Sequence, residues 1–417
     1  MKGEKMAIVK PFKALRPVPE KAASIASPPY DVVDTEEARE MAKDNPHSFL
    51  HVVRSEIDLP PGTDPYSPIV YQKAAENLNR LNNDGALFRD ETPAFYIYSQ
   101  RMGGHFQTGI VACCAVDDYD SGIIRKHELT RKEKEDDRLR HILTTSAQTG
   151  PVFLMYKDVT NLDILMKESC DRESILYSFT APDGVEHMAR RISDPKCIEN
   201  ITKEFTCVPN LYIADGHHRS AAFSRACAER RKNNPSHTGR EEYNYFMAVL
   251  FPAGTLKILP YNRIVKDLAG LTRNDFIARI KQQFKVSETA NPVPAMKGHF
   301  GMYIDGKWHL LFEKPWGHKS DDPVAKLDCQ ILQDYLLGPI LGIKDPCTDN
   351  RIGFVGGIHG HPKLKNMVDN GKATVAFLLH PVTAEDIMSV SDSGKTMPPK
   401  STWFEPKLKS GLFIHQI

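Results

Sequence analysis

Four side chains that could bind a ligand or take part in catalysis lie within five consecutive positions near the middle of the chain. They are Asp215, His217, His218 and Arg219, and Gly216 follows the first of them. Gly216 can adopt backbone conformations that a side chain would forbid. The backbone N–H groups at a helix start, together with the helix dipole, favour an anion. Arg219 can bind a phosphate or carboxylate through two parallel hydrogen bonds, whereas Asp215 could cap the helix, hold a metal ion or accept a proton. The combination predicts a phosphate- or nucleotide-binding turn.

Each of these residues also has a purely structural interpretation. Asp–Gly is a common turn pair, Asp is a common helix cap, and a histidine in the first turn of a helix is usually only solvated. The flanking elements favour function, because an apolar strand leads into the turn and an alanine-rich helix follows over residues 217–231. We therefore interpret the turn as a binding site.

A second cluster of polar residues lies upstream of the turn. Residues 126–138 alternate both signs of charge at spacings of three and four, which is also typical of a solvated, salt-bridged helix. His127 and Glu128 lie outside the strongest helical spacing, and a carboxylate beside an imidazole suits proton transfer.

The two ends of the chain supply further candidates on segments shaped by proline. Tyr30 and Asp31 follow two prolines near the start, and Lys400, Ser401 and Thr402 follow two prolines near the end. An ammonium and two hydroxyls on a rigid arm suit a phosphate or a small polar substrate, although an ordinary exposed loop would look the same. Because binding residues concentrate on loops, we predict that both ends meet the central turn around one cleft.

Two other motifs match a nucleotide-binding loop and a zinc site only in part. The glycine-rich stretch 350–357 lacks the Gly-Lys-Ser/Thr ending of a Walker A sequence. His359 and His361 could join His217 and His218 in a zinc site, yet their spacing is not the i, i+4 spacing of a helix and no cysteine pair supports them.

Composition narrows the class of protein. A chain of 417 residues should form two or three globular units. Its 54 basic and 53 acidic residues balance, so no overall field draws it to nucleic acid or to an anionic membrane. Eight cysteines without a Cys-x-x-Cys pair, and no apolar leader, predict reduced thiols in a cytoplasmic protein. No stretch approaches the roughly 20 apolar residues of a membrane span.

Periodicity predicts a mixed α/β (α+β) protein with mixed sheets. Three segments are expected, over residues 1–125, 126–268 and 269–417. Capping and periodic patterns predict helices over 35–43, 71–83, 194–204, 217–231, 274–284, 325–337 and 384–390, with partial helix over 126–141. Strands are predicted over 94–100, 106–116, 243–251, 256–265, 301–304, 307–313 and 374–379.

Four motifs together resemble a large bacterial and archaeal family of unknown function. They are Ala-Ser-Pro-Pro-Tyr-Asp-Val at 26–32, Lys-His-Glu-x-Thr at 126–130 with Glu-Asp-Asp-Arg at 135–138, Ala-Asp-Gly-His-His-Arg at 214–219, and Met-Pro-Pro-Lys-Ser-Thr at 397–402. The resemblance extends from Val9 to Ile417. Within it, Asp-Gly-His-His-Arg resembles the nucleotide motif of the free-serine kinases of the ParB/sulfiredoxin superfamily. Those kinases phosphorylate L-serine to O-phosphoserine with ADP or ATP and magnesium.

This resemblance implies a ParB/sulfiredoxin-like core with additional N- and C-terminal segments. Asp215 would correspond to the acidic residue near the serine hydroxyl and would hold that hydroxyl or Mg²⁺, and Glu128 is the candidate for a separate carboxylate base. The implied catalytic residues are Glu128, Asp215 and His217, and the implied nucleotide-binding residues are Gly216, His217, His218 and Arg219. The implied substrate-binding residues are Tyr30, Asp31, His127, Lys400, Ser401 and Thr402.

The sequence therefore predicts a cytoplasmic, nucleotide-dependent small-molecule kinase with L-serine as its best candidate acceptor. Its expected partners are ATP or ADP and a small hydroxyl metabolite; a homodimer is left open, and neither a membrane nor a nucleic acid is expected. One alternative is a ParB-like nucleotide-binding switch or DNA-associated protein, which ranks lower because no helix-turn-helix with clustered Lys and Arg is evident. A metal-dependent hydrolase or nuclease built on the histidines is the third.

Overall fold

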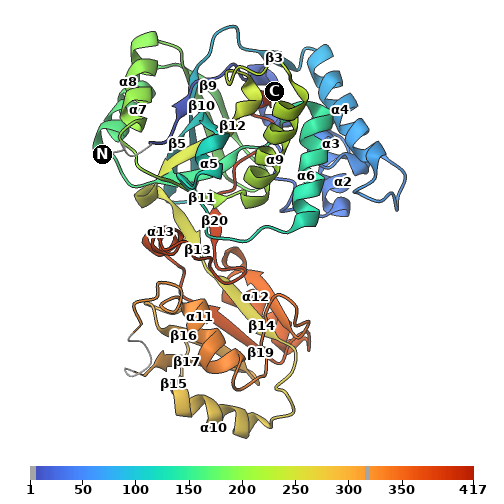
Figure 1. Ribbon diagram of the computed structural model, residues 1–417. Helices are drawn as coiled ribbons and strands as arrows, with labels where there is room; N and C mark the ends of the chain where they lie inside the picture. Colours follow the sequence, from blue (N-terminus) through green and yellow to red (C-terminus); the bar gives the residue numbers. More distant parts are fainter. Residues whose placement is uncertain (1–5, 315–319) are drawn as a thin grey trace. The chain divides into compact units, whose positions relative to one another are not determined.

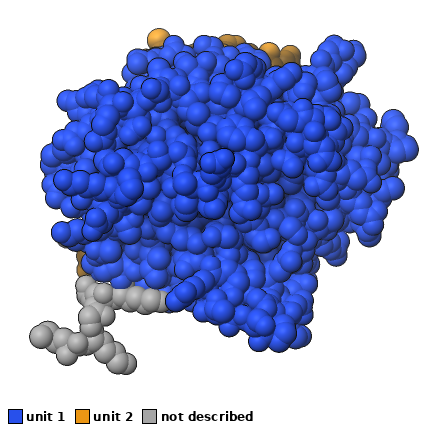
Figure 2. Space-filling model, turned by 90° about the horizontal axis from the view of Figure 1, so that it is seen from above, with its two compact units in different colours: residues 1–256, 406–417 blue, residues 257–405 orange. Residues whose placement is uncertain are grey.

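The computed structural model describes residues 6–314 and 320–417, which form two compact units (Figures 1 and 2). Unit 1 comprises Met1–Leu256 and Pro406–Ile417, and unit 2 comprises Lys257–Glu405. The three expected segments do not coincide with these units. The boundary expected after residue 125 falls inside unit 1, because strands from both sides of it pair in one sheet. The boundary expected after residue 268 falls inside unit 2.

Unit 1 is built on a nine-stranded mixed sheet in the order β6-β11-β8-β12-β5-β4-β10-β9, with β1 paired to β5. Only the pairs β6–β11 and β8–β12 are parallel. The strands are β1 (Val9–Lys10), β4 (Phe95–Met102), β5 (His105–Ala115), β6 (Ile124–Arg125), β8 (Val152–Tyr156), β9 (Ile175–Thr180), β10 (Glu186–Ile192), β11 (Leu211–Asp215) and β12 (Tyr245–Pro252). The predicted hairpin is confirmed as β4–β5, and the mixed α/β class is confirmed with it.

The helices of unit 1 follow most of the capping signals in the sequence. They are α1 (Ala22–Ile25), α2 (Thr35–Ala42), α3 (Leu50–Val53), α4 (Pro68–Asn83), α5 (Val116–Asp120), α6 (Lys132–Thr145), α7 (Thr160–Arg172), α8 (Pro195–Phe205) and α9 (His217–Asn233). Asp34 caps α2 by accepting from the backbone of Glu37 at 2.8 Å, and the Glu37 carboxylate accepts from the backbone of Asp34 at 2.9 Å. The helix expected over 126–141 begins only at Lys132, because the residues before it form β6 and a loop beside α9.

Two apolar clusters hold these elements together. One joins buried side chains of β5, β8, β11 and β12 to α7, α8 and α9, including Phe205 and Phe223. The other joins α2, α3 and α4 to the short pair β2 (Leu15–Pro17) and β3 (Leu87–Arg89). Figure 1 shows α7 and α8 to the left of the sheet and α4, α6 and α9 to its right. Cys113 and Cys114 are buried in β5.

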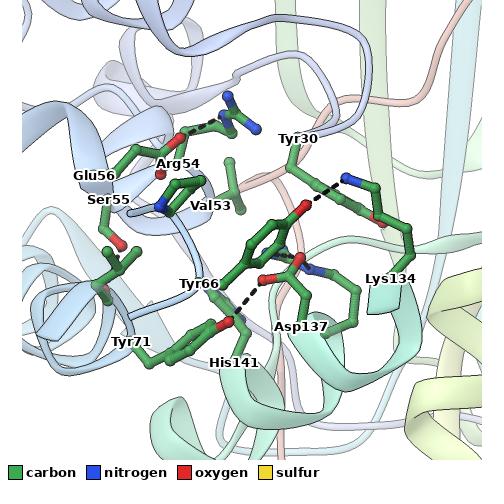
Figure 3. A pocket seen from close by; sticks show the side chains of 13 residues that line it. Tyr30, Val53, Arg54, Ser55, Glu56, Tyr66, Tyr71, Lys134, Asp137 and His141 are labelled. Carbon is green, nitrogen blue, oxygen red and sulfur yellow. Dashed lines mark hydrogen bonds and ion pairs between the residues drawn. The ribbon is translucent and has the colours of Figure 1, made fainter. Parts of the chain in front are cut away.

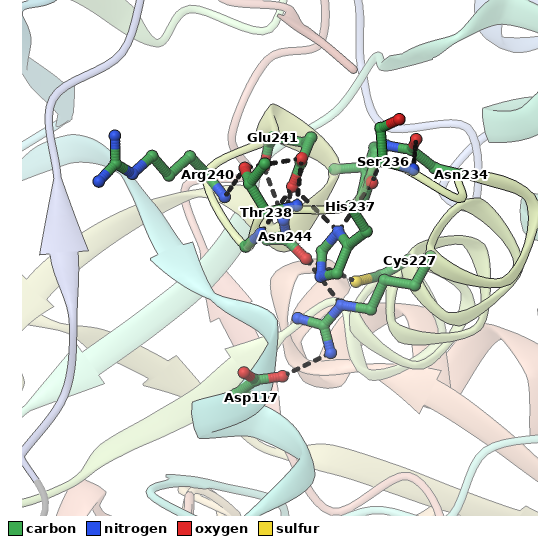
Figure 4. A network of polar contacts seen from close by, with 12 residues as sticks. Asp117, Cys227, Asn234, Ser236, His237, Thr238, Arg240, Glu241 and Asn244 are labelled. Atoms are coloured by element: carbon green, nitrogen blue, oxygen red, sulfur yellow. Dashed lines mark hydrogen bonds and ion pairs between the residues drawn. The ribbon is translucent and has the colours of Figure 1, made fainter.

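The C-terminal end of α9 is fixed by a polar network (Figure 4). Arg231 donates to Asn244 at 2.7 Å and to Asp117 at 2.8 Å. Asn244 in turn donates to the backbone oxygen of Glu241 at 3.0 Å. These contacts anchor the C-terminal end of α9 to α5 and to the residues just before β12.

Unit 2 is a six-stranded antiparallel sheet in the order β15-β17-β16-β19-β14-β18, with a separate pair β13–β20. Its strands are β13 (Lys257–Leu259), β14 (Tyr261–Val265), β15 (Phe284–Glu288), β16 (His299–Ile304), β17 (Lys307–Glu313), β18 (Ile352–Gly356), β19 (Val375–Leu379) and β20 (Trp403–Glu405). Its helices are α10 (Arg273–Gln283), α11 (Asp328–Leu332), α12 (Gly360–Asp369) and α13 (Ala384–Asp392). The helix expected over 325–337 is shorter and changes at Gln333 into a π-helical turn that ends at Leu337.

The chain returns from unit 2 to unit 1 at Pro406, and its last strand, β21 (His415–Gln416), pairs with β7 (Ala147–Gln148). Within the ranges that the structure describes, no helix has the length and apolar character needed to cross a membrane.

Candidate functional site

The turn between β11 and α9 has the conformation that its glycine requires. The pairing of β11 with β8 is irregular between Ile213 and Asp215, and such irregularities re-aim side chains at strand ends. Gly216 then takes the left-handed region at φ 101° and ψ 29°, and α9 begins at the next residue. A Cβ on Gly216 would lie 3.1 Å from both Cζ and Nε of Arg219. The glycine therefore leaves the space in which the guanidinium lies.

Asp215 lies between two cationic side chains. Its Oδ2 is 3.1 Å from the Nζ of Lys407, and its Oδ1 is 3.5 Å from the Nη2 of Arg219. Burial acts to raise the pKa of Asp215, but the charges of Lys407 and Arg219 outweigh burial and hold the pKa below its usual range. Asp215 therefore stays ionised and is a weak proton acceptor.

His217 is buried and oriented from two sides. Its Nε2 accepts from the backbone N–H of His127 at 3.4 Å, so in the neutral ring the proton is on Nδ1. That Nδ1 lies 3.6 Å from Oε2 of Glu128, slightly beyond hydrogen-bond distance. Burial lowers the pKa of His217, and the neighbouring His127 lowers it further. A neutral His217 thus presents an N–H to the carboxylate of Glu128.

His127 packs edge-on against His217, with ring centroids 4.4 Å apart and an interplanar angle of 87°. Burial lowers the pKa of His127 to about 4. Neither ring therefore carries a charge at neutral pH. The backbone N–H of His127 fixes the tautomer of the His217 ring, so His127 positions His217.

Tyr30 and Asp31 lie near the same turn. The guanidinium of Arg138 stacks on the ring of Tyr30 at 3.9 Å, and burial raises the pKa of the Tyr30 hydroxyl. Asp31 is exposed, and its charge acts on both His218 and Arg219. His218 accepts from the backbone N–H of Arg131 at 3.1 Å, which ties α9 to the loop before α6.

Two small cavities share the wall formed by Tyr30, Arg138 and His141. The cavity of about 30 Å³ reaches Arg219 and Thr149, and the cavity of about 50 Å³ is shown in Figure 3. Water needs about 10–15 Å³, so each cavity has room for a few waters rather than for a nucleotide.

A family model described as "Protein of unknown function (DUF1015)" matches residues 9–330. The chain belongs to this family. The family resemblance suggested by the four sequence motifs is thereby confirmed. No curated protein matches the sequence.

Several solved structures are similar to this DUF1015 chain. A free serine kinase in complex with AMP has 11% identity and a TM-score of 0.35, over 73% of this chain and 91% of that chain. A conserved hypothetical protein from Pyrococcus furiosus has 13% identity and a TM-score of 0.34, over 73% and 94%. SbnI with a C-terminal truncation, from Staphylococcus aureus, has 10% identity and a TM-score of 0.39, over 73% and 86%. The chemistry of the site rests on the side chains described above.

Magnesium, which the kinase resemblance implies, finds no ready ligand set at the turn. Each carboxylate oxygen of Asp215 faces a cation, so Asp215 does not fit the role of metal ligand expected from the sequence. Within residues 6–314 and 320–417, no group of three His, Cys, Asp or Glu side chains is placed to hold a metal ion. We therefore derive no step through a metal.

Lys400, Ser401 and Thr402 belong to unit 2, so their meeting with the turn stays a prediction. Ser401 is buried and donates to the backbone oxygen of Pro398 at 2.6 Å. Lys400 takes a positive φ of 54°, and its Nζ lies 5.5 Å from the ring centre of Tyr261. Within unit 2 these residues hold a proline-rich segment in place.

Local sequence patterns indicate neither Lys407 nor Arg138 as a residue of the candidate site. Lys407 is 192 positions from its partner Asp215, and no local pattern around it indicates a pairing. The charge pattern around Arg138 predicts a solvated helix, whereas its side chain is only 12% exposed, stacks on Tyr30 and pairs with Asp137 at 2.8 Å. Its place in the motif Glu-Asp-Asp-Arg was the one available signal.

Proposed function

We propose that this protein is a nucleotide-dependent kinase that phosphorylates a small alcohol, with free L-serine as the acceptor. The observation that carries the proposal is the Arg219 guanidinium, folded over the left-handed Gly216 at the start of α9. Its side chain is only 10% exposed, and in the described part of the chain its Nε has no hydrogen-bond partner. Because a buried donor without a partner costs about 1–3 kcal/mol, an oxyanion here would be stabilised.

The surroundings of Arg219 suit a phosphate group. The 17-residue helix α9 has no side-chain cap at Gly216, so its first N–H groups and its dipole favour an anion. Lys407 adds a second positive charge, and Asp215 holds both cations in place. Phosphoryl transfer depends mainly on positioning and charge neutralisation, which these groups supply.

Proton transfer is assigned to Glu128. The side chain of Glu128 is 42% exposed and lies beside the Nδ1–H of His217, whereas Asp215 is held ionised between two cations. The acceptor hydroxyl would give its proton to Glu128 while its oxygen bonds to the terminal phosphorus and the bond to the bridging oxygen breaks. The Nδ1–H of His217 lies 3.6 Å from this carboxylate and would come within hydrogen-bond distance of it after a small movement of either side chain.

Incubation of the purified protein with ATP or ADP, Mg²⁺ and a panel of hydroxyl metabolites tests the proposal. Mass spectrometry should find O-phosphoserine when L-serine is present, and Glu128→Gln should abolish most of it. Nucleotide hydrolysis that needs no acceptor would instead support the hydrolase alternative. Binding without turnover would support the nucleotide switch. The cytoplasmic location, the ParB/sulfiredoxin-like core and the homodimer stay predictions.

A further inference from the structure

Unit 2 contains a cavity of about 230 Å³ that plays no part in the proposed phosphoryl transfer. Its wall includes Arg263 of β14, Cys329 of α11, Gln333 of the π-helical turn, and the pair Pro398 and Pro399. The volume is several times the roughly 30 Å³ that one water occupies in the liquid, and it lies below the roughly 300–1,000 Å³ of typical small-molecule pockets. The cavity therefore suits a ligand of few non-hydrogen atoms.

Arg263 brings a buried positive charge to this cavity. The residue is 4% exposed, and its guanidinium donates to the backbone oxygens of Tyr261 and Pro399. No carboxylate of the described residues pairs with it. Burial lowers the pKa of Arg263, and the groups that oppose this effect are the Cys329 thiol and the Tyr261 phenol. Burying a guanidinium without a negatively charged partner costs free energy. An anion bound in the cavity would provide that negative charge.

Gln333 brings a buried acceptor to the same cavity. Its Nε2 donates to the backbone oxygen of Ile343 at 2.7 Å, which fixes the orientation of the amide. Its Oε1 is buried and has no hydrogen-bond partner in the part of the chain that the structure describes. Gln333 also opens the π-helical turn, and such turns occur frequently at functional sites. Oε1 of Gln333 would accept a hydrogen bond from an O–H or N–H group of the ligand.

A chain of hydrogen bonds holds the proline wall in place. The Ser401 hydroxyl donates to Pro398 at 2.6 Å, so the thiol of Cys329, 3.2 Å away, is the donor to the Ser401 oxygen. Burial raises the pKa of Cys329, which keeps the thiol protonated. The wall is therefore formed before any ligand arrives, and preorganisation of this kind improves affinity.

We propose that this cavity binds a small carboxylate that carries a hydroxyl or amino group beside its carboxyl group. The carboxylate pairs with Arg263, and the neighbouring O–H or N–H donates to Oε1 of Gln333. Lys344 also lines the cavity and adds positive charge, while the nearby carboxylate of Asp334 is engaged by Gln330 at 2.8 Å. The inference concerns unit 2 alone and does not depend on the proposed kinase activity.

Titration of the full-length protein with glycolate, acetate and inorganic phosphate, followed by calorimetry or NMR, tests this site. Glycolate should bind more tightly than acetate, which lacks the hydroxyl, and more tightly than phosphate. Arg263→Met should weaken glycolate binding roughly tenfold to a hundredfold, the range for a charged hydrogen bond. Lys307→Met is the matched control, because it removes an exposed cation of the same unit that does not line the cavity, and it should bind as the wild type does.

Gln333→Leu keeps the test decisive if Arg263→Met does not fold. This variant retains the charge and removes the acceptor, so it should bind glycolate and acetate equally. Absence of glycolate binding to the wild-type protein would overturn the proposal. So would tighter binding of phosphate than of glycolate, or unchanged glycolate affinity in a folded Arg263→Met. Since the readout is binding in unit 2, failure of the kinase assay would leave it unaffected.

Discussion

At the scale of single residues, the two carboxylates of the candidate site lie in different electrostatic environments. Asp215 is held between Lys407 and Arg219, whereas Glu128 lies beside the N–H of His217. Paired carboxylates in different electrostatic environments commonly take different roles, one staying ionised and the other moving a proton. In the proposed mechanism, Glu128 therefore takes the proton, and Asp215 holds Lys407 and Arg219 in place.

Removal of the Arg219 guanidinium should weaken nucleotide binding. Arg219→Ala removes a charged hydrogen bond worth about 1.5–3 kcal/mol, which corresponds to roughly tenfold to a hundredfold in affinity. Isothermal titration with ADP measures the effect. Arg225→Ala, on the same helix but paired with Glu135 and Asp136, should leave the affinity unchanged. Equal affinities in the wild type and Arg219→Ala would remove the turn from the nucleotide site.

Replacement of the proposed base should affect the chemical step rather than binding. Glu128→Gln is expected to lower kcat by about 10²- to 10⁴-fold, the usual contribution of general-base catalysis, with little change in nucleotide affinity. Phosphoserine formation at saturating nucleotide measures kcat. Near-normal turnover in this variant would assign the proton to another group, with Asp215 the first to examine.

The depressed pKa of Asp215 predicts a pH-dependent contribution to stability. A carboxyl group whose folded pKa lies below its ordinary value of 3.8 stabilises the fold above that value, and the contribution is lost as pH falls towards the folded pKa. Asp215→Asn should therefore reduce the urea midpoint near neutral pH and have a smaller effect near pH 3. The exposed Asp44→Asn is the control and should change little at either pH. An equal loss at both pH values would show that the Asp215 charge is not the cause.

At the scale of elements, the strand–glycine–helix unit determines where Arg219 lies. β11 ends in an irregular pairing, Gly216 turns the chain through a left-handed conformation, and α9 starts without a side-chain cap at Gly216. The polar network at Arg231 fixes the opposite end of α9. Both ends of the helix are thus positioned by contacts outside it.

Two glycine substitutions can separate backbone strain from the space that Arg219 needs. Gly216→Ala introduces a side chain at φ 101° and places its Cβ 3.1 Å from the guanidinium. Gly85→Ala introduces one at φ 68° with no atom within 4 Å. Each should cost about 1–2 kcal/mol of backbone strain, but only Gly216→Ala should also weaken ADP binding. Thermal melting and calorimetry measure the two effects, and intact ADP affinity in Gly216→Ala would contradict the proposed geometry.

At the scale of the whole molecule, the segment that forms unit 2 separates Lys407 from the other residues of the candidate site in the sequence. The chain leaves unit 1 at Leu256 and returns at Pro406, and the next residue is Lys407. The remaining C-terminal residues bring β21 to β7. The site in unit 1 is therefore built from positions at both extremes of the sequence.

Lys407 gives this long-range link a direct test. Lys407→Met should weaken ADP binding roughly tenfold through loss of one charged contact, and Lys407→Arg, which keeps the charge, should restore most of the affinity. Calorimetry on both variants measures the difference. If Lys407→Met binds ADP as the wild type does, the lysine only neutralises Asp215 and does not contact phosphate.

The sequence alone determined the features that depend on a few neighbouring residues. The capping box of α2, the β4–β5 hairpin and the glycine turn before α9 follow from backbone preferences and local hydrogen bonds, and these act over three or four positions. The tertiary structure decided which side chains contact one another across the chain. Two contacts join residues more than a hundred positions apart: Asp215 pairs with Lys407, and Arg138 stacks on Tyr30. Packing also buries the charged side chain of Arg263. Such contacts depend on how whole elements pack, which no local pattern records.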